Sequence, residues 1–92
     1  MSVDTVIHSI TSLRQWVIQH PENFHTDDQR RLLLVLDCMR DPLMKENIAE
    51  FDRYVDSLLA RQPDTADFVL EEMFEHLNIG TRDELTAVLV AA

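Results

Sequence analysis

The sequence predicts an all-α fold, a compact bundle of four to five short helices around a single core, with residues 1–92 forming one helical domain. Three observations lead to this prediction. Apolar residues recur at spacings of three and four, the period of an amphipathic helix. The chain has one glycine and three prolines, and its apolar residues never alternate cleanly between turn dipeptides, so no strand is predicted. Short turn signals separate five segments, as in a helical bundle.

The first helix is predicted from about Val3 to Gln19. Ser2 or Asp4 is the expected N-cap. His20-Pro21 is expected to end the helix, because a residue that precedes proline is pushed out of the α region. The core side of this helix is marked by apolar residues at helical spacing, namely Val6, Ile10, Leu13 and Val17.

The second helix is predicted to open at Thr26. Thr26 and Gln29 have the spacing of a capping box, in which each side chain bonds a backbone N–H of the first turn. The segment 32–39 is apolar almost all round, which predicts the most buried helix of the bundle. Cys38 lies in this segment and is predicted to be a small buried apolar side chain. As the single cysteine of the chain, it cannot form an intrachain disulfide.

The third helix is predicted to begin at Pro42, where proline is tolerated as the first helical residue, with Asp41 as its cap. An apolar stripe follows at alternating spacings of four and three, through Met44, Ile48, Phe51, Val55 and Leu58. Two interpretations of this stripe stay open. It is either one side of the bundle core or the seam of a dimerising coiled coil, although it spans fewer than three heptads.

The fourth helix is predicted to begin at Asp64 or Thr65 and to end at Asn78, with Gly80 as a left-handed C-cap. Its expected core side consists of Ala66, Val69, Leu70, Met73 and Leu77. The fifth helix is predicted to open with a second capping box, Thr81 to Glu84, and to continue to the C-terminus.

The charge balance limits the classes of partner. Seventeen acidic residues outnumber eight basic ones, for a net charge of −9. Such a chain repels nucleic acid and anionic membranes and attracts basic proteins. Neither direct nucleic-acid binding nor membrane binding is therefore predicted. The longest apolar run, Leu32–Leu36, is too short to span a membrane. The N-terminus shows no secretory-signal pattern, so a cytoplasmic location is expected.

The sequence predicts no catalytic residue, metal site or cofactor, and therefore not an enzyme. Phosphate-binding loops need glycines that this chain lacks. Carboxylates on open helical faces keep ordinary acidity, whereas catalysis needs one of them in an apolar pocket. A small metal-dependent hydrolase that uses clustered carboxylates stays open as a third hypothesis. No two histidines have the i, i+4 spacing of helical metal ligands, the four being His8, His20, His25 and His76.

The fourth predicted helix carries the feature that points most directly to a function. Asp64, Asp67, Glu71 and Glu75 fall within about 80° of arc on a helical wheel. Each like-charge pair four residues apart costs the helix roughly 0.2–0.5 kcal/mol. These neighbouring like charges therefore make the helix slightly less stable.

Two aromatic residues flank the acids, and two interpretations again stay open. The acids are either a solvated face, with the rings at the edge of the core, or a surface that attracts a basic partner and anchors it on the rings. On the second interpretation, the candidate partner-binding residues are Asp67, Phe68, Glu71, Glu72, Phe74 and Glu75.

From these observations we predict a small acidic binding protein that neutralises a basic partner protein. The class that fits best is an immunity protein or antitoxin that blocks a toxin nuclease, since a nuclease site is basic in order to bind phosphates. The alternative is a regulatory adaptor, anti-activator or secretion chaperone that acts through an apolar helical groove. A homodimer belongs to this alternative, and the oligomeric state stays open.

Overall fold

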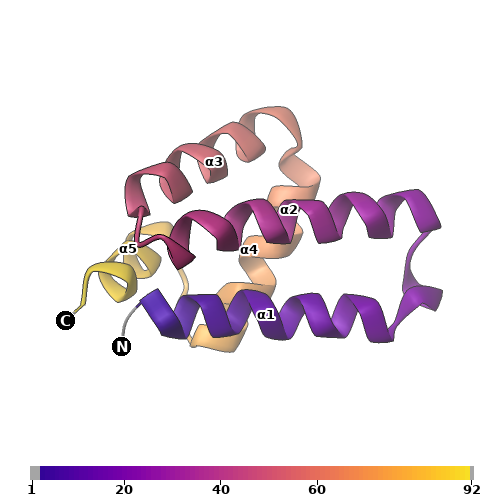
Figure 1. Cartoon of the computed structure of the whole chain (residues 1–92), viewed down its shortest axis with the longest axis horizontal. Helices are drawn as coiled ribbons and strands as arrows, with labels where there is room; N and C mark the ends of the chain where they lie inside the picture. The colour runs from indigo at the N-terminus through magenta and orange to yellow at the C-terminus, as the bar shows by residue number, and fades with distance from the viewer. Residues whose placement is uncertain (1–2, 92) are drawn as a thin grey trace.

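The computed structural model describes residues 3–91 and confirms the all-α prediction (Figure 1). Within this range the chain forms five α-helices and one short 3₁₀ turn, and no strand. The elements are α1 (Val3–Gln19), η1 (Pro21–Asn23), α2 (Thr26–Met44), α3 (Ile48–Arg61), α4 (Pro63–Leu77) and α5 (Arg82–Val90).

The helices pack in one compact body of 39 × 25 × 25 Å. α1 and α2 lie side by side as an antiparallel pair joined by η1, and α3 turns back along α2 (Figure 1). α4 contacts both α3 and α1, because it crosses behind the first pair. α5 packs against α1. This crossing brings the acidic helix, α4, beside a helix from the opposite end of the sequence.

All five helices contribute to a single core. The stripe on α3 lies inside it, since Phe51 and Val55 are fully buried and Leu58 is 5% exposed. This placement matches the core interpretation of the stripe and leaves no coiled-coil seam on the surface of α3. Burying side chains of this size stabilises the fold by roughly 1.5–3 kcal/mol each. The largest fully buried side chains are Phe51, Ile10, Leu36, Met39, Leu43, Met73 and Leu85.

The ends of α1 agree with the prediction. The helix spans Val3–Gln19, and His20-Pro21 separates it from η1. Asp4 lies in its first turn, where a negative charge is favourable to the helix dipole. The predicted cap at Ser2 lies outside the described residues.

The predicted boundary between the second and third helices is wrong. α2 continues through Pro42 to Met44, and α3 begins only after Asn47, whose Oδ1 accepts a hydrogen bond from the Glu50 N–H at 3.1 Å. A proline in the last turn removes one backbone hydrogen bond while its buried ring packs in the core. Met44 therefore belongs to α2, where its side chain is 64% exposed rather than part of the stripe.

The predicted left-handed residue after α4 is also wrong. Asn78, with φ 55°, takes that conformation, and the following Ile79 N–H donates to the Phe74 carbonyl at 2.9 Å. The helix ends before it reaches the glycine, and asparagine tolerates the left-handed region better than most residues. The Gly80 N–H instead donates to Glu84 Oε1 at 3.3 Å.

One predicted capping box is present and the other is not. The Glu84 N–H donates to Thr81 Oγ1 at 3.1 Å, as predicted at the start of α5. At the start of α2, Thr26 is already helical and the residue before it makes no side-chain cap. Gln29 bonds instead to the preceding helix, its Nε2 donating to the Val17 carbonyl at 3.0 Å. The side chain therefore ties α2 to the end of α1.

α2 contributes more buried residues than any other described helix, as predicted, but it is not covered on all sides. Leu34 is 63% exposed, and Cys38 is half-buried rather than fully buried. The physical reason is that α1 and α3 pack against α2 and leave part of its circumference to solvent. Within residues 3–91, no helix has both the length and the hydropathy needed to cross a membrane.

Candidate partner-binding face

The acids of α4 lie on the surface. Asp67, Glu71, Glu72 and Glu75 are all exposed. Within residues 3–91 the ion pairs involve other acids, so none of these four carboxylates has a basic partner. The sequence of α4 contains no lysine or arginine. The helix therefore presents negative charge that the rest of the described chain does not neutralise. We call these four residues the acidic face.

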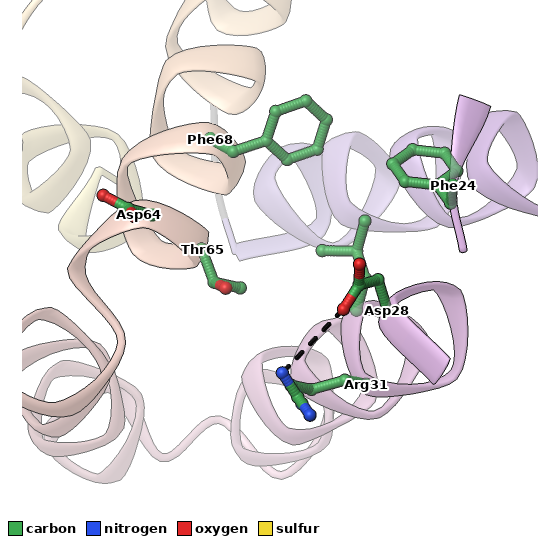
Figure 2. A pocket seen from close by; sticks show the side chains of 7 residues that line it. Phe24, Asp28, Arg31, Asp64, Thr65 and Phe68 are labelled. Carbon is green, nitrogen blue, oxygen red and sulfur yellow. Dashed lines mark ion pairs between the residues drawn. The ribbon is translucent and has the colours of Figure 1, made fainter. Parts of the chain in front are cut away.

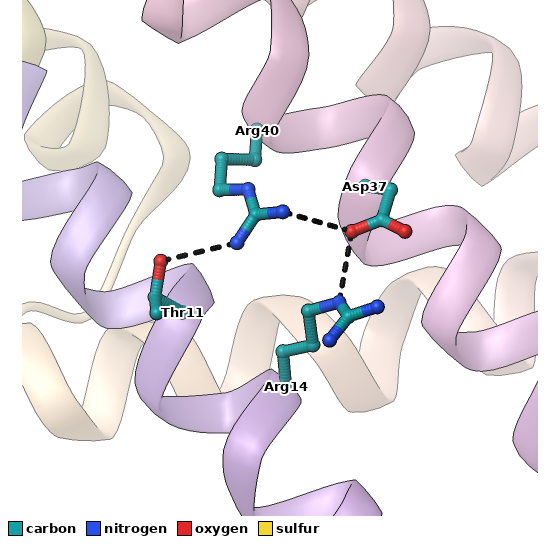
Figure 3. A network of polar contacts seen from close by, with 4 residues as sticks. All are labelled: Thr11, Arg14, Asp37 and Arg40. Carbon is teal, nitrogen blue, oxygen red and sulfur yellow. Dashed lines mark hydrogen bonds and ion pairs between the residues drawn. The ribbon is translucent and has the colours of Figure 1, made fainter.

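Several basic residues are instead used to hold other helices together. Arg14 Nε, on α1, donates to Asp37 Oδ1 on α2 at 2.9 Å (Figure 3). Arg40 Nη2 donates to the same oxygen at 3.1 Å, and Arg40 Nη1 lies 3.5 Å from Thr11 Oγ1. Two arginines thus share one carboxylate at the α1–α2 contact.

A second such contact links α5 to α3. Arg82 Nη1 lies 3.0 Å from Asp56 Oδ1, and Arg82 Nη2 lies 3.5 Å from Asp52 Oδ1. This pairing neutralises acids on α3 and leaves those on α4 unaffected. The acids of α4, a helix without lysine or arginine, thus have no basic partner within residues 3–91.

The two predicted aromatic anchors are only partly accessible. Phe68 and Phe74 are half-buried and pack against the core. The Phe68 ring meets Phe24 edge to face, with centroids 6.4 Å apart and an interplanar angle of 79°. Packing at the edge of the core thus accounts for part of each ring, and only the remaining surface can meet a partner.

An aromatic row next to the acidic face was not predicted. Trp16 stacks on His20 at 4.7 Å and meets Phe24 edge to face at 6.0 Å, and Phe24 continues the row to Phe68. Trp16 stays 39% exposed. The row joins α1, the segment after η1 and α4. Helical periodicity places each ring on its own element but does not say which elements meet, so the row could not be predicted from the sequence.

A shallow pocket of about 220 Å³ opens at the start of α4. Figure 2 shows Phe24 and Phe68 on one side of it, and Asp64 and Thr65 on the first turns of α4. Arg31 and Asp28 approach from α2 and form a long ion pair of 3.9 Å, with both side chains more than half exposed. Its walls and rim suit an apolar or amphipathic side chain. The lining residues are Phe24, Asp28, Arg31, Leu32, Asp64, Thr65 and Phe68.

Within residues 3–91, no three His, Cys, Asp or Glu side chains come together in a way that could hold a metal ion. The groups on this face are exposed carboxylates and half-buried aromatic rings. Comparison with protein-family models, curated proteins and solved structures found no match to this chain.

Proposed function

We propose that this chain is a small acidic binding protein that neutralises a basic protein in the cytoplasm, as an immunity protein or antitoxin does when it blocks a toxin nuclease. The observation that carries the proposal is the acidic face. Asp67, Glu71, Glu72 and Glu75 are exposed and have no basic partner within residues 3–91.

The physical argument is electrostatic complementarity. A nuclease binds phosphates with a cleft of arginines and lysines, so its active site is a basic surface of definite shape. A helix whose exposed acids have no internal partner is attracted to such a cleft and excludes the nucleic acid by occupying it. Complementary charge raises association rates by roughly 10- to 1,000-fold.

Apolar contact next to the acids would convert attraction into a stable complex. Tight interfaces bury a small apolar centre and surround it with polar groups. The pocket in Figure 2 supplies such a centre, with Phe24 and Phe68 in its wall and Asp64 at the start of the same helix that carries the acidic face. The expected footprint therefore runs along α4 and ends at this pocket.

The proposal describes a binding protein rather than an enzyme. The alternative of an adaptor, anti-activator or secretion chaperone depends on an apolar helical groove, for which the stripe on α3 was the candidate. Phe51 and Val55 fill the core instead, so the described structure favours the acidic face over that groove.

The test is to capture the partner and measure its activity. The chain is immobilised, exposed to lysate of its own host at low salt, and eluted with a salt gradient. We expect a basic protein to elute as the salt rises, and its nuclease activity to fall in proportion to added chain until the two are equimolar. The readout is cleavage of a fluorescent RNA or DNA substrate.

The control is a variant that reverses charge on the face, Glu71→Lys/Glu75→Lys, checked for unchanged helicity by circular dichroism. This variant should neither capture nor inhibit the protein. Capture of an acidic protein, or of a basic one whose activity the chain leaves unchanged, would contradict the proposal.

A further inference from the structure

We infer that a pocket between α1 and α4 binds an arginine side chain of the basic partner. The pocket holds about 190 Å³ and lies where the two helices cross. The inference rests on the proposed function for the identity of the partner, but the pocket can be tested by itself with a small guanidinium compound. The lining residues are Ser9, Ser12, Leu13, Trp16, Glu72 and His76.

The pocket contains an unpaired negative charge. Glu72 belongs to the acidic face, and it also lines this pocket. Its carboxylate is exposed and has no basic partner within residues 3–91. A cation that entered the pocket would therefore meet an unpaired carboxylate beside apolar walls, where an ion pair is screened less than on open surface.

The pocket is also lined by a residue whose buried hydroxyl has no hydrogen-bond partner. Ser9 is only 2% exposed, and its Oγ has no hydrogen-bond partner. A buried polar atom without a partner destabilises the fold. Ser9 also lines the pocket, so a change of its side-chain rotamer can turn the hydroxyl oxygen toward an occupant. A bound N–H donor would satisfy this oxygen.

The wall of the pocket is partly apolar and aromatic. Trp16 and Leu13 contribute apolar surface, and the single indole of the chain is the ring type that attracts cations most strongly. The volume is also sufficient, because one water molecule needs only roughly 10–15 Å³ of such space. The pocket therefore has room for a side chain and not merely for solvent.

These features together favour arginine over lysine. A guanidinium group is planar and carries five N–H donors, so it can lie against an indole while it donates to two separate oxygens. Here those oxygens are the Glu72 carboxylate and the Ser9 hydroxyl. A lysine ammonium is more strongly hydrated and cannot stack, so it gains less from the apolar wall.

The test is to titrate the full chain with Nα-acetyl-arginine amide and, separately, with Nα-acetyl-lysine amide at physiological salt. Trp16 fluorescence reports binding, and amide chemical shifts at Ser9 and Ser12 locate it. We expect a saturable response to the arginine compound, with the lysine compound binding at least roughly fivefold more weakly. No saturable response, or equal affinity for the two compounds, would overturn the inference.

Three variants sharpen this test. Glu72→Gln should weaken binding of the arginine compound severalfold, whereas Glu46→Gln should leave it unchanged, since Glu46 is an exposed glutamate that belongs neither to the pocket nor to the acidic face. Ser9→Ala should weaken binding and yet raise the melting temperature of the free chain, because it removes the unpartnered hydroxyl. Equal loss of affinity in both glutamate variants would contradict a specific site.

The outcomes separate this inference from the proposed function. If the arginine compound binds as expected but no basic protein is captured from lysate, the pocket stands and the proposed function falls. If a basic nuclease is captured and inhibited while the arginine compound fails to bind, the function stands and the arginine site is wrong.

Discussion

Among the polar side chains, Asp37 contributes most directly to the contact between α1 and α2. Its Oδ1 accepts hydrogen bonds from both Arg14 and Arg40, and the three side chains are only 24–34% exposed (Figure 3). Without this carboxylate, two positive charges would face each other across a half-buried contact. Hydrogen bonds to charged groups contribute more to stability than neutral ones, roughly 1.5–3 kcal/mol each.

We predict that Asp37→Asn lowers the free energy of unfolding by about 1–2 kcal/mol, less than the full contribution of such bonds because solvent screens the partly exposed groups. The matched control is Asp56→Asn, which removes a carboxylate that pairs with Arg82 but is 70% exposed. The Asp56→Asn control should lower the free energy of unfolding by less than about 0.5 kcal/mol. Urea unfolding followed by Trp16 fluorescence measures both, and equal losses would contradict the role given to Asp37.

Tyr54 shows how local burial changes the acidity of a residue. Burial, with a smaller contribution from the neighbouring Cys38, raises the pKa of Tyr54 from its ordinary value of 10.0 to about 12. The folded state therefore keeps the phenol proton at a pH where the unfolded state has lost it. The resulting stabilisation is complete below about pH 10 and is lost as the pH rises toward about 12.

The single tyrosine makes this shift directly measurable by its ultraviolet absorbance. We predict that the phenol of the folded chain titrates near pH 12, and that Cys38→Ala lowers its pKa without restoring the ordinary value of 10.0, because burial is the larger cause. Circular dichroism at each pH verifies that the chain is still folded. A folded chain whose phenol titrates near pH 10 would contradict the burial described for Tyr54.

At this scale, sequence reasoning found the charges but not their surroundings. It identified Glu71, Glu72 and Glu75 as a candidate surface, and the structure leaves them exposed. It did not predict that Phe68 packs against Phe24, or that Ser9 is buried without a partner. Those contacts depend on which helices cross, and helical periodicity carries no such information.

At the scale of elements, the helix ends show where local patterns fail. The sequence predicted a new helix at Pro42, because proline is favoured at the first position of a helix. The structure instead ends α2 at Met44 and turns at Glu46, a left-handed residue with φ 57°. Its neighbour, the Asn47 N–H, donates back to the Pro42 carbonyl at 2.8 Å. Proline is also tolerated in the last turn of a helix. The sequence alone therefore could not distinguish the end of one helix at Pro42 from the start of the next.

Glu46 is therefore a position of backbone strain. The left-handed conformation destabilises a residue with a β-carbon by roughly 1–2 kcal/mol. Glycine adopts it almost without strain but loses more conformational entropy on folding. We predict that Glu46→Gly raises the free energy of unfolding by about 0.5–1 kcal/mol.

The matched control for this prediction is Glu46→Ala, which removes the same charge but keeps the β-carbon. It should give no gain, because the left-handed conformation stays strained. Thermal and urea unfolding of both variants provide the comparison. An equal gain for alanine would show that the carboxylate, and not the backbone, limits stability at this turn.

The capping residues also show that a local pattern fails where a distant group competes with it. The box from Thr81 to Glu84 was predicted and is present, because both of its members lie in one turn and need no other helix. The box proposed for Gln29 is absent, because its side chain has a competing acceptor on α1. A local motif was predictable where no distant group competes for it.

At the scale of the whole molecule, the fold class followed from the sequence and the functional surface followed only in part. The five helical segments and the core position of Phe51 were predictable from period and punctuation. The absence of basic partners for the acids of α4 was not fully predictable, since it also depends on arginines such as Arg82 pairing with acids on other helices. The net charge of −9 is thus unevenly distributed over the fold.

We therefore expect the acidic face, rather than net charge in general, to recognise the basic partner. The comparison that tests it uses two variants of equal charge, each changing the chain from −9 to −5, because two substitutions to lysine add two charges apiece. Glu71→Lys/Glu75→Lys alters the face. Asp41→Lys/Glu46→Lys alters the C-terminal end of α2, where lysines are favourable to the helix dipole.

The most direct measurement is the association rate constant of the captured basic partner with the chain and with each variant, by stopped-flow fluorescence across ionic strengths from low to physiological. We predict that the rate with the unaltered chain falls steeply as salt rises, that the α2 variant keeps most of the rate, and that the α4 variant loses roughly tenfold or more at low salt. Equal rates for the two variants, or rates that do not change with salt, would contradict the claim that the acidic face of α4 recognises a basic protein.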